Sequence, residues 1–296
     1  MAFVDNQGAR IYWDEQGQGE PVLLIMGLGY PSAMWYRIRP ALAARYRTIA
    51  LDNRGAGLSD TPPGPYPIRQ MASDAAAVLE AAGVESAHVF GVSMGGMIAQ
   101  EFVLQYSPRV LSLILGCTAA GGPTAVRAEP DAIQMLMTRG KMSAEEAAEA
   151  AVPFIYDRAT PREWIDEDLA VRRPWFPSPE GYAAQLQGIL AWEAYSRLCE
   201  IVAPTLVIHG ESDLLVPPGN ANLIAERIPG AKVVMIPHAS HLFLTDQPEA
   251  AQRAILDFLA AQSAAMAAGK GRERSDGQPL DNSSSQNLSE QDKASC

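Results

Sequence analysis

The chain has 296 residues, which is enough for one large domain or two small ones with a sizeable apolar core. Hydrophobic residues make up 48% of it and charged residues 19%, a globular balance that excludes fibrous and largely disordered classes. The formal net charge of −11 argues against nucleic acid or an anionic membrane surface as a partner, because both are themselves negative.

Short runs rich in Val, Ile and Leu alternate with longer segments of helical periodicity. At the start, two short apolar segments flank the sequence Asp-Asn-Gln-Gly at residues 5–8 and predict an antiparallel ribbon. Residues 68–82 predict a helix that ends at Gly83. Six further apolar runs predict buried strands: residues 21–26, 48–52, 88–92, 111–116, 205–209 and 232–236. This alternation is typical of a mostly parallel sheet covered by helices.

The alternation stops between residues 121 and 199, which have helical composition. We therefore expect a helical cap at 121–199, inserted into a core domain that is formed by residues 1–120 and 200–262. Within the cap, residues 131–139, 143–151 and 181–197 are the segments that predict helices.

Residues 224–229 and 249–261 predict the last two helices of the core. The remaining segment, 269–296, is polar and contains no aromatic residue. Such a segment cannot bury enough apolar surface to offset the entropy lost on ordering, so we expect it to be disordered.

The strongest local motif is Gly91-Val92-Ser93-Met94-Gly95, between a predicted strand and a predicted helix at residues 95–106. A sharp strand-to-helix turn of this kind forces its central residue into a strained backbone conformation and needs small residues two positions before and after it. The motif therefore predicts a nucleophile elbow that presents Ser93 at the carboxyl end of the sheet.

A serine hydroxyl needs a base to remove its proton, and the base needs a carboxylate to orient it. In chains with this turn, both partners follow the serine at the ends of late strands. Asp213 follows the predicted strand at 205–209, with Glu211 as a competitor. His241 follows the strand at 232–236, with His238 as its rival. The sequence favours Ser93, Asp213 and His241.

These features together, with Pro248 following His241, resemble the α/β-hydrolase superfamily over roughly residues 1–262. Residues 52–59, Asp-Asn-Arg-Gly-Ala-Gly-Leu-Ser, match a turn that shapes the floor beside the active site in that family. The resemblance implies an α/β fold with a doubly wound, mostly parallel, eight-stranded sheet and a helical cap insertion. The Ser-Met-Gly-Gly run and the short cap are similar to those of 3-oxoadipate enol-lactonases, aclacinomycin-type methylesterases and cofactor-free haloperoxidases.

Many members of that superfamily begin the loop after the first parallel strand with His-Gly, whereas this chain has Met26-Gly27-Leu28-Gly29-Tyr30. The oxyanion donors of such sites are backbone N–H groups, so the histidine is not itself needed to form the hole. By position, the resemblance places the two donors at Leu28 and Met94.

Aromatic residues of the cap, and those after the oxyanion loop, are candidates to line an apolar substrate pocket. We expect Trp35, Trp164 and Trp192 to do so. The competing interpretation is that aromatic residues at helical spacing pack the cap onto the sheet.

The resemblance implies a serine hydrolase that cleaves a small, largely apolar carboxylic ester or lactone through an acyl-enzyme, without a cofactor. One alternative is a C–C bond hydrolase, or a cofactor-free perhydrolase or haloperoxidase, that uses the same three residues. Against C–C cleavage, the resembling C–C hydrolases usually carry Asn where this chain has Val92. The other alternative is a non-catalytic ligand receptor on the same scaffold. The sequence leaves a homo-oligomer open.

Three cysteines, Cys117, Cys199 and Cys296, are too few and too scattered to predict a disulfide framework or a metal cluster. The N-terminal residues show no basic segment followed by an apolar run, and no apolar stretch reaches membrane-spanning length. The sequence therefore predicts a cytoplasmic protein without a membrane anchor or a metal site.

Overall fold

A computed structural model describes residues 2–275. They form a sheet of eight strands in the order β1-β2-β4-β3-β5-β6-β7-β8. β1 and β2 form an antiparallel hairpin, β2 is antiparallel to β4, and all other neighbours are parallel. The strands are β1 (Ala2–Asn6), β2 (Ala9–Gln16), β3 (Pro21–Ile25), β4 (Arg47–Leu51), β5 (Ala87–Val92), β6 (Val110–Gly116), β7 (Thr205–Gly210) and β8 (Lys232–Ile236). The predicted eight-stranded α/β sheet is confirmed.

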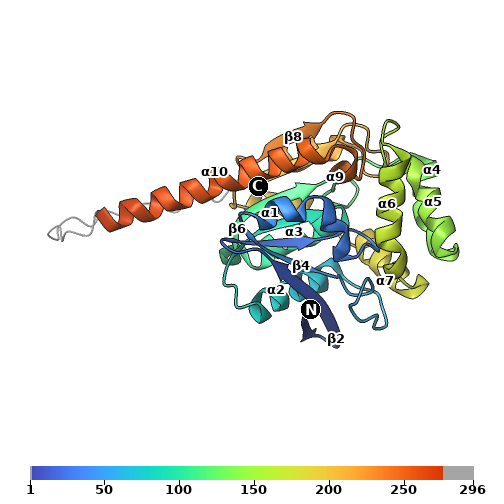
Figure 1. Cartoon of the computed structure of the whole chain (residues 1–296), viewed down its shortest axis with the longest axis horizontal. Coiled ribbons are helices and arrows are strands. Elements are labelled where there is room, and N and C mark those ends of the chain that lie inside the picture. Colours follow the sequence, from blue (N-terminus) through green and yellow to red (C-terminus); the bar gives the residue numbers. More distant parts are fainter. Residues whose placement is uncertain (1, 276–296) are drawn as a thin grey trace.

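Helices cover both faces of this sheet (Figure 1). Alternate residues of a strand point to opposite faces, and in β3 Leu23 and Ile25 join one apolar cluster while Val22 and Leu24 join another. The first cluster packs against α2 (Ile68–Ala81), α3 (Met94–Gln105) and α8 (Gly219–Arg227). The second packs against η1 (Ser32–Arg37), α1 (Arg39–Ala43), α9 (Phe243–Asp246) and α10 (Pro248–Ser275). Burial on both faces explains why the central strands read as continuous apolar runs.

The cap lies between β6 and β7 in the sequence and gathers at one end of the molecule (Figure 1). Its helices are α4 (Pro130–Thr138), α5 (Ala144–Ile155), α6 (Arg162–Arg172) and α7 (Pro179–Leu190), with short 3₁₀ turns η3 (Arg139–Lys141), η4 (Arg173–Trp175) and η5 (Tyr195–Glu200). The parallel strands end toward the cap, so the loops that follow β3, β5, β7 and β8 meet beneath it.

The helices of the structure differ from the predicted ones in the cap and at the end of the chain. The cap contains a helix, α6, that the sequence pattern did not predict, and the helix expected at 181–197 ends at Leu190. The last helix, α10, does not stop near residue 261 but continues to Ser275, which places the first seven residues of the expected disordered segment in a helix. The rest of that segment, 276–296, lies outside the described residues.

One further 3₁₀ segment, η2 (Ser107–Arg109), connects α3 to β6. Within residues 2–275, none of the helices combines the length and the apolar character that crossing a membrane requires.

Candidate active site

The turn between β5 and α3 places Ser93 in a strained conformation, with φ 57° and ψ −122°. The two glycines explain how the chain tolerates it. A Cβ atom at Gly91 would overlap the backbone of Gly95, and a Cβ atom at Gly95 would overlap the carbonyl of Ile25 in the neighbouring strand. Only glycine fits at both positions, so the expected sharp elbow is present and holds Ser93 at the start of α3.

Backbone groups around Ser93 fix this turn to the sheet. The Ser93 N–H donates to the carbonyl of Gly116 at the end of β6 (2.8 Å). The Ser93 carbonyl accepts from the hydroxyl of Thr118 (2.7 Å) as well as from two N–H groups of α3. Thr118 is therefore a positioning residue that the sequence pattern did not point to.

His241 and Asp213 form a buried pair at the ends of β8 and β7. His241 Nδ1 lies 2.8 Å from Asp213 Oδ2, and the exposed fractions of the two residues are 5% and 2%. The other carboxylate oxygen, Oδ1, accepts from the N–H groups of Leu215 (2.9 Å) and Val216 (2.8 Å). Because both oxygens are engaged, the carboxylate can orient the imidazole with little freedom of its own.

The competing candidates lie in different surroundings. Glu211 is exposed, and its N–H donates to Ile236 at the end of β8. His238 is also exposed, with a positive φ of 55°, and its carbonyl accepts from Gln247. The geometry therefore places Asp213 and His241, and neither competitor, in a buried pair.

The pKa of the Asp213 carboxyl is lowered to about 2. Burial by itself raises this pKa, but the charge of His241, together with hydrogen bonds from His209 and His241, outweighs burial. Asp213 is thus held as a carboxylate at every pH at which the protein is expected to work.

A second histidine, His209, also contacts Asp213. Its Nε2 atom lies 2.8 Å from the carbonyl oxygen of Val216 and 3.3 Å from Asp213 Oδ2. Cys117 completes a buried group of three whose ligand atoms all lie within 4.8 Å of one another, a grouping that the scattered positions of the cysteines in the sequence did not indicate. Burial and the charge of Asp213 raise the pKa of the Cys117 thiol well above its usual value. A metal ion here would compete with His241 for Asp213, so the group fits a structural role beneath the pair.

The loop after β3 brings Leu28 beside Ser93, at the wall of the same cavity. The N–H groups of Leu28 and Met94 donate to no acceptor within residues 2–275, and that of Met94 is free because it begins α3. Two unpaired donors beside Ser93 are what an oxyanion hole requires, and these are the two predicted positions.

Two side-chain amides, those of Asn53 and Gln185, hold the oxyanion loop in position. Asn53 Nδ2 donates to the carbonyl of Met26 (2.8 Å) from one side. On the other side, Gln185 of α7 accepts from the N–H of Gly29 (2.8 Å) and donates to the carbonyl of Arg54 (2.7 Å). Gln185 is fully buried, so a cap helix sets the position of the loop. Sequence reasoning missed Gln185, because nothing near it in the sequence marks the contact.

The turn at 52–59 supports the same region from below. Asp52 accepts from the N–H groups of Ser32 (2.5 Å) and Leu58 (2.8 Å), and burial raises the pKa of its carboxyl. Arg54 and Asp74, both about 1% exposed, form a buried ion pair at 2.6 Å. These contacts fix the end of β4 and with it the Asn53 amide.

Asp246 anchors the loop that carries His241. Its carboxylate accepts from the N–H of Ser240 (2.7 Å), the N–H of Asp157 (3.2 Å) and the hydroxyl of Thr160 (2.6 Å). Burial raises the pKa of Asp246 to about 6, against the opposing effect of these three hydrogen bonds. The loop is thereby tied to the cap next to His241.

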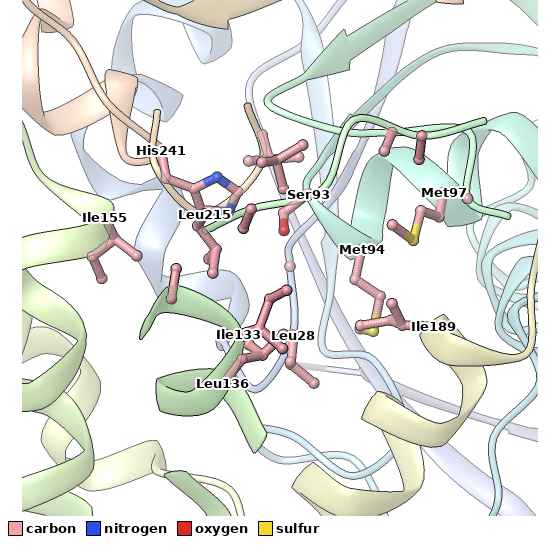
Figure 2. A pocket seen from close by; sticks show the side chains of 18 of the residues that line it. Leu28, Ser93, Met94, Met97, Ile133, Leu136, Ile155, Ile189, Leu215 and His241 are labelled. Carbon is pink, nitrogen blue, oxygen red and sulfur yellow. The ribbon is translucent and has the colours of Figure 1, made fainter. Parts of the chain in front are cut away.

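Ser93, His241, Leu28 and Met94 line one cavity of about 550 Å³ beneath the cap. Figure 2 shows the His241 ring on one side of Ser93, with Met94 on the other side and Leu28 below. The Ser93 hydroxyl makes no hydrogen bond within residues 2–275, and hydrogen bonds of catalytic groups often form only when substrate is bound. Most other lining side chains are apolar, among them Met97, Ile133, Leu136, Ile155, Ile189 and Leu215.

The three tryptophans expected in the pocket lie elsewhere, which corrects that prediction. Trp35 is fully buried against Phe90 within the second apolar cluster, with ring centres 4.9 Å apart. Trp164 lies beneath the guanidinium of Arg37, and Trp192 donates its Nε1–H to Glu101 (3.0 Å). These rings pack the cap and the core, and aliphatic and methionine side chains line the cavity in their place.

Comparison with known proteins agrees with this geometry. The family model described as the alpha/beta hydrolase fold matches residues 20–248, and the chain belongs to this family of hydrolases. A RutD protein of Azorhizobium caulinodans, named as a candidate carbamate hydrolase, is 34% identical over 268 residues that cover 87% of this chain and 98% of that protein.

Two further proteins are similar over most of their length. A poly(3-hydroxyalkanoate) depolymerase of Ectopseudomonas oleovorans is 33% identical over 242 residues, covering 81% of this chain and 84% of the depolymerase. The structure of a thermophilic esterase from Thermogutta terrifontis superimposes with a TM-score of 0.76 at 29% identity and covers 88% of this chain and 97% of the esterase.

Proposed function

We propose that the protein is a serine hydrolase that cleaves a small, largely apolar carboxylic ester or lactone through an acyl-enzyme. The observation that carries this proposal is the buried His241–Asp213 pair at 2.8 Å, in the same cavity as a serine on a strained elbow. The esterase and depolymerase relatives support ester chemistry, since their names describe enzymes of that class.

In the proposed acylation step, His241 Nε2 takes the proton of the Ser93 hydroxyl as Ser93 Oγ attacks the ester carbonyl carbon. The N–H groups of Leu28 and Met94 stabilise the negative oxygen of the tetrahedral intermediate. Asp213 holds the imidazole in one orientation and stabilises its positive charge. His241 then gives its proton to the leaving alkoxide, and an acyl-Ser93 ester remains.

Deacylation repeats these roles with water in place of the serine hydroxyl. His241 takes a proton from water, the resulting hydroxide attacks the acyl carbon, and Ser93 leaves with the proton that His241 returns. The products are the free acid and the original enzyme. Each proton is accounted for by His241 alone, so these steps need no group beyond the residues described.

The test is a turnover panel with the full-length wild type and a Ser93→Ala variant. The panel holds p-nitrophenyl esters of short-chain acids, small lactones, a carbamate ester and vinylogous 1,5-diketones. We expect kcat/KM for the best ester or lactone to exceed that for any diketone by about a hundredfold or more. C–C cleavage expels a carbanion-like group that needs additional polar stabilisation, which the largely apolar lining does not offer. Efficient diketone cleavage with negligible ester turnover would overturn the proposal.

A further inference from the structure

The cavity lining contains two positively charged side chains, those of Arg127 and Arg139. No acidic side chain of the described residues lines this cavity. A lining without acidic side chains is unexpected in a chain whose formal net charge is −11. A mostly apolar cavity with unpaired cations attracts a ligand that combines an apolar body with a negative group.

Arg139 has a particular position among these cations. It is half-buried and follows α4 directly, three residues after Leu136, which lines the same cavity as Leu28. Arg139 and Leu28 also both line a second cavity of about 190 Å³, in which no described lining residue is acidic. Arg139 therefore stands beside the oxyanion loop, at the boundary of the two cavities.

A buried guanidinium adds positive charge on the same side. Arg172 of α6 is 1% exposed, and its three side-chain nitrogens have no hydrogen-bond partner among the described residues. It stacks 3.9 Å from the ring centre of Tyr30, which lines the main cavity, and 5.4 Å from that of Phe176, which lines the smaller one. Burial lowers the pKa of Arg172, and the charge of nearby Arg139 adds to this effect, while Tyr30, Tyr156 and Asp168 oppose it.

Other arginines in and near the cap differ from this pair. Arg162 is paired with Glu149 (2.6 Å), Arg37 with Asp168 (3.1 Å) and Arg197 with Glu101 (2.8 Å). Within residues 2–275, neither Arg139 nor Arg172 has an acidic partner within 4 Å. Two neighbouring arginines without a carboxylate in direct contact are costly unless a ligand supplies one.

The proposed chemistry gives the direction in which a bound ester extends. His241 protonates the leaving alkoxide, so the alcohol part lies toward His241. The acyl part then extends away from His241 into the rest of the cavity, whose apolar lining includes Leu28, Ile133 and Leu136, which lie below Ser93 in Figure 2. Arg139 lines the same cavity as these apolar side chains.

We propose that Arg139, supported by the positive charge of Arg172 behind Tyr30, binds a terminal carboxylate on the acyl part of the substrate, which makes the protein selective for half-esters of dicarboxylic acids. This inference rests on the proposed ester hydrolysis. The apolar residues that line the cavity together with Ser93 and Arg139 take up the methylene chain of such an acid, and the guanidinium takes up the carboxylate.

The kinetic test compares mono-p-nitrophenyl adipate, which is anionic, with p-nitrophenyl hexanoate, which is neutral. The readout is the ratio of kcat/KM for the anionic over the neutral ester, because the chemistry at Ser93 divides out of that ratio. We expect Arg139→Gln to lower the ratio by about tenfold or more, since a charge-assisted contact is lost. Arg139→Lys is expected to retain most of it. Raising the ionic strength should lower the ratio of the wild type.

Arg45→Gln is the matched control, because it removes one exposed positive charge outside the residues that line either cavity. Its ratio should equal that of the wild type. An equal fall in the Arg45→Gln and Arg139→Gln variants would overturn the subsite, because only net charge would then matter. An unchanged ratio in Arg139→Gln would also overturn the subsite. In that case, hydrolysis of both esters by the wild type would still support the proposed function.

A binding measurement separates the two proposals. Titration calorimetry of monomethyl adipate into full-length Ser93→Ala protein needs no turnover. We expect the dissociation constant to rise about tenfold or more when Arg139→Gln is added to this background, and methyl hexanoate to show no such rise. Equal affinity of the two proteins for monomethyl adipate contradicts the subsite even if no ester is hydrolysed.

Discussion

Asp213 Oδ2 lies 2.8 Å from His241 Nδ1 across 28 residues of chain that include all of β8. The contact forms because β7 and β8 are parallel neighbours, so the loops after them leave the sheet at the same edge. The pair is buried, and Asp213 has four neighbours on its two oxygens. The position of the imidazole is therefore set by the sheet itself.

The first prediction concerns this pair. Asp213→Asn should lower kcat by about 10⁴-fold, because an amide donor facing Nδ1 favours the wrong tautomer of His241. Glu211→Gln is the matched control on the same loop and should cost less than about tenfold, since Glu211 is exposed. Both are measured with the best ester of the panel. The reverse ranking would transfer the role of the acid to Glu211.

The second prediction concerns the oxyanion loop. Gln185→Ala removes the acceptor for the Gly29 N–H and the donor to the Arg54 carbonyl. Loss of an oxyanion donor costs about 10² to 10³ in kcat, so a donor that is only displaced should cost about tenfold or more. We expect KM to change by less than about threefold, because the apolar lining stays in place.

Gln187→Ala controls for this change, because Gln187 is exposed on the same helix, α7. Its kcat should match that of the wild type. A Gln185→Ala variant in which only KM changes, or only the melting temperature, would show that Gln185 stabilises the cap without positioning the oxyanion loop.

The third prediction concerns Asp246 and pH. The folded-state pKa of about 6 lies above the unfolded value of 3.8, so the folded protein binds the proton more tightly. The contribution of Asp246 to stability is therefore fully present below about pH 4 and is lost as the pH rises to about 6. Asp246→Asn keeps the shape of the side chain and should remove this part of the pH dependence of stability.

The measurement is the free energy of unfolding between pH 4 and pH 7 for the wild type and the variant. A shift of this size corresponds to on the order of 2 kcal/mol across the window. Asp257→Asn, an exposed change in α10, should leave the wild-type profile unaltered. If the wild type and Asp246→Asn profiles run parallel, the raised pKa of Asp246 is refuted.

The fold could be predicted from the sequence because its central strands are buried on both faces. Continuous apolar runs such as Pro21–Ile25 and Thr205–Gly210 then stand out, and Gly91 and Gly95 mark the elbow through a steric requirement that acts locally. The places of Ser93 and His241 at one cavity follow from the same strand ends. Their chemical roles remain predictions.

The cap was predicted less well, for a physical reason that α6 illustrates. Its buried face contains Asp168 and Arg172 beside Ile165 and Leu169, so half of that face is charged. Asp168 accepts hydrogen bonds from Tyr36, Arg37, Tyr156 and Thr245, which come from three separate segments of the chain. Apolar periodicity does not reveal such a helix, because hydrogen bonds from distant segments of the chain stabilise its buried charges.

The prediction of the pocket residues was wrong for a related reason. Trp35, Trp164 and Trp192 were chosen for their size and place in the sequence, yet each ring has a partner in the packed interior or on the cap. Gln185 and Arg139 were missed because their surroundings are assembled only when the cap folds over the strand ends. Neither residue belongs to a motif.

The central claim, that Ser93 is the nucleophile, is tested most directly by covalent labelling. A p-nitrophenyl alkyl phosphonate is incubated with the full-length wild type and with Ser93→Ala, and the adducts are located by peptide mass spectrometry. The account predicts one adduct per wild-type chain, on the peptide that contains Ser93, together with loss of ester turnover, and no adduct on Ser93→Ala. An adduct on another residue, or a Ser93→Ala variant that retains full turnover, would contradict it.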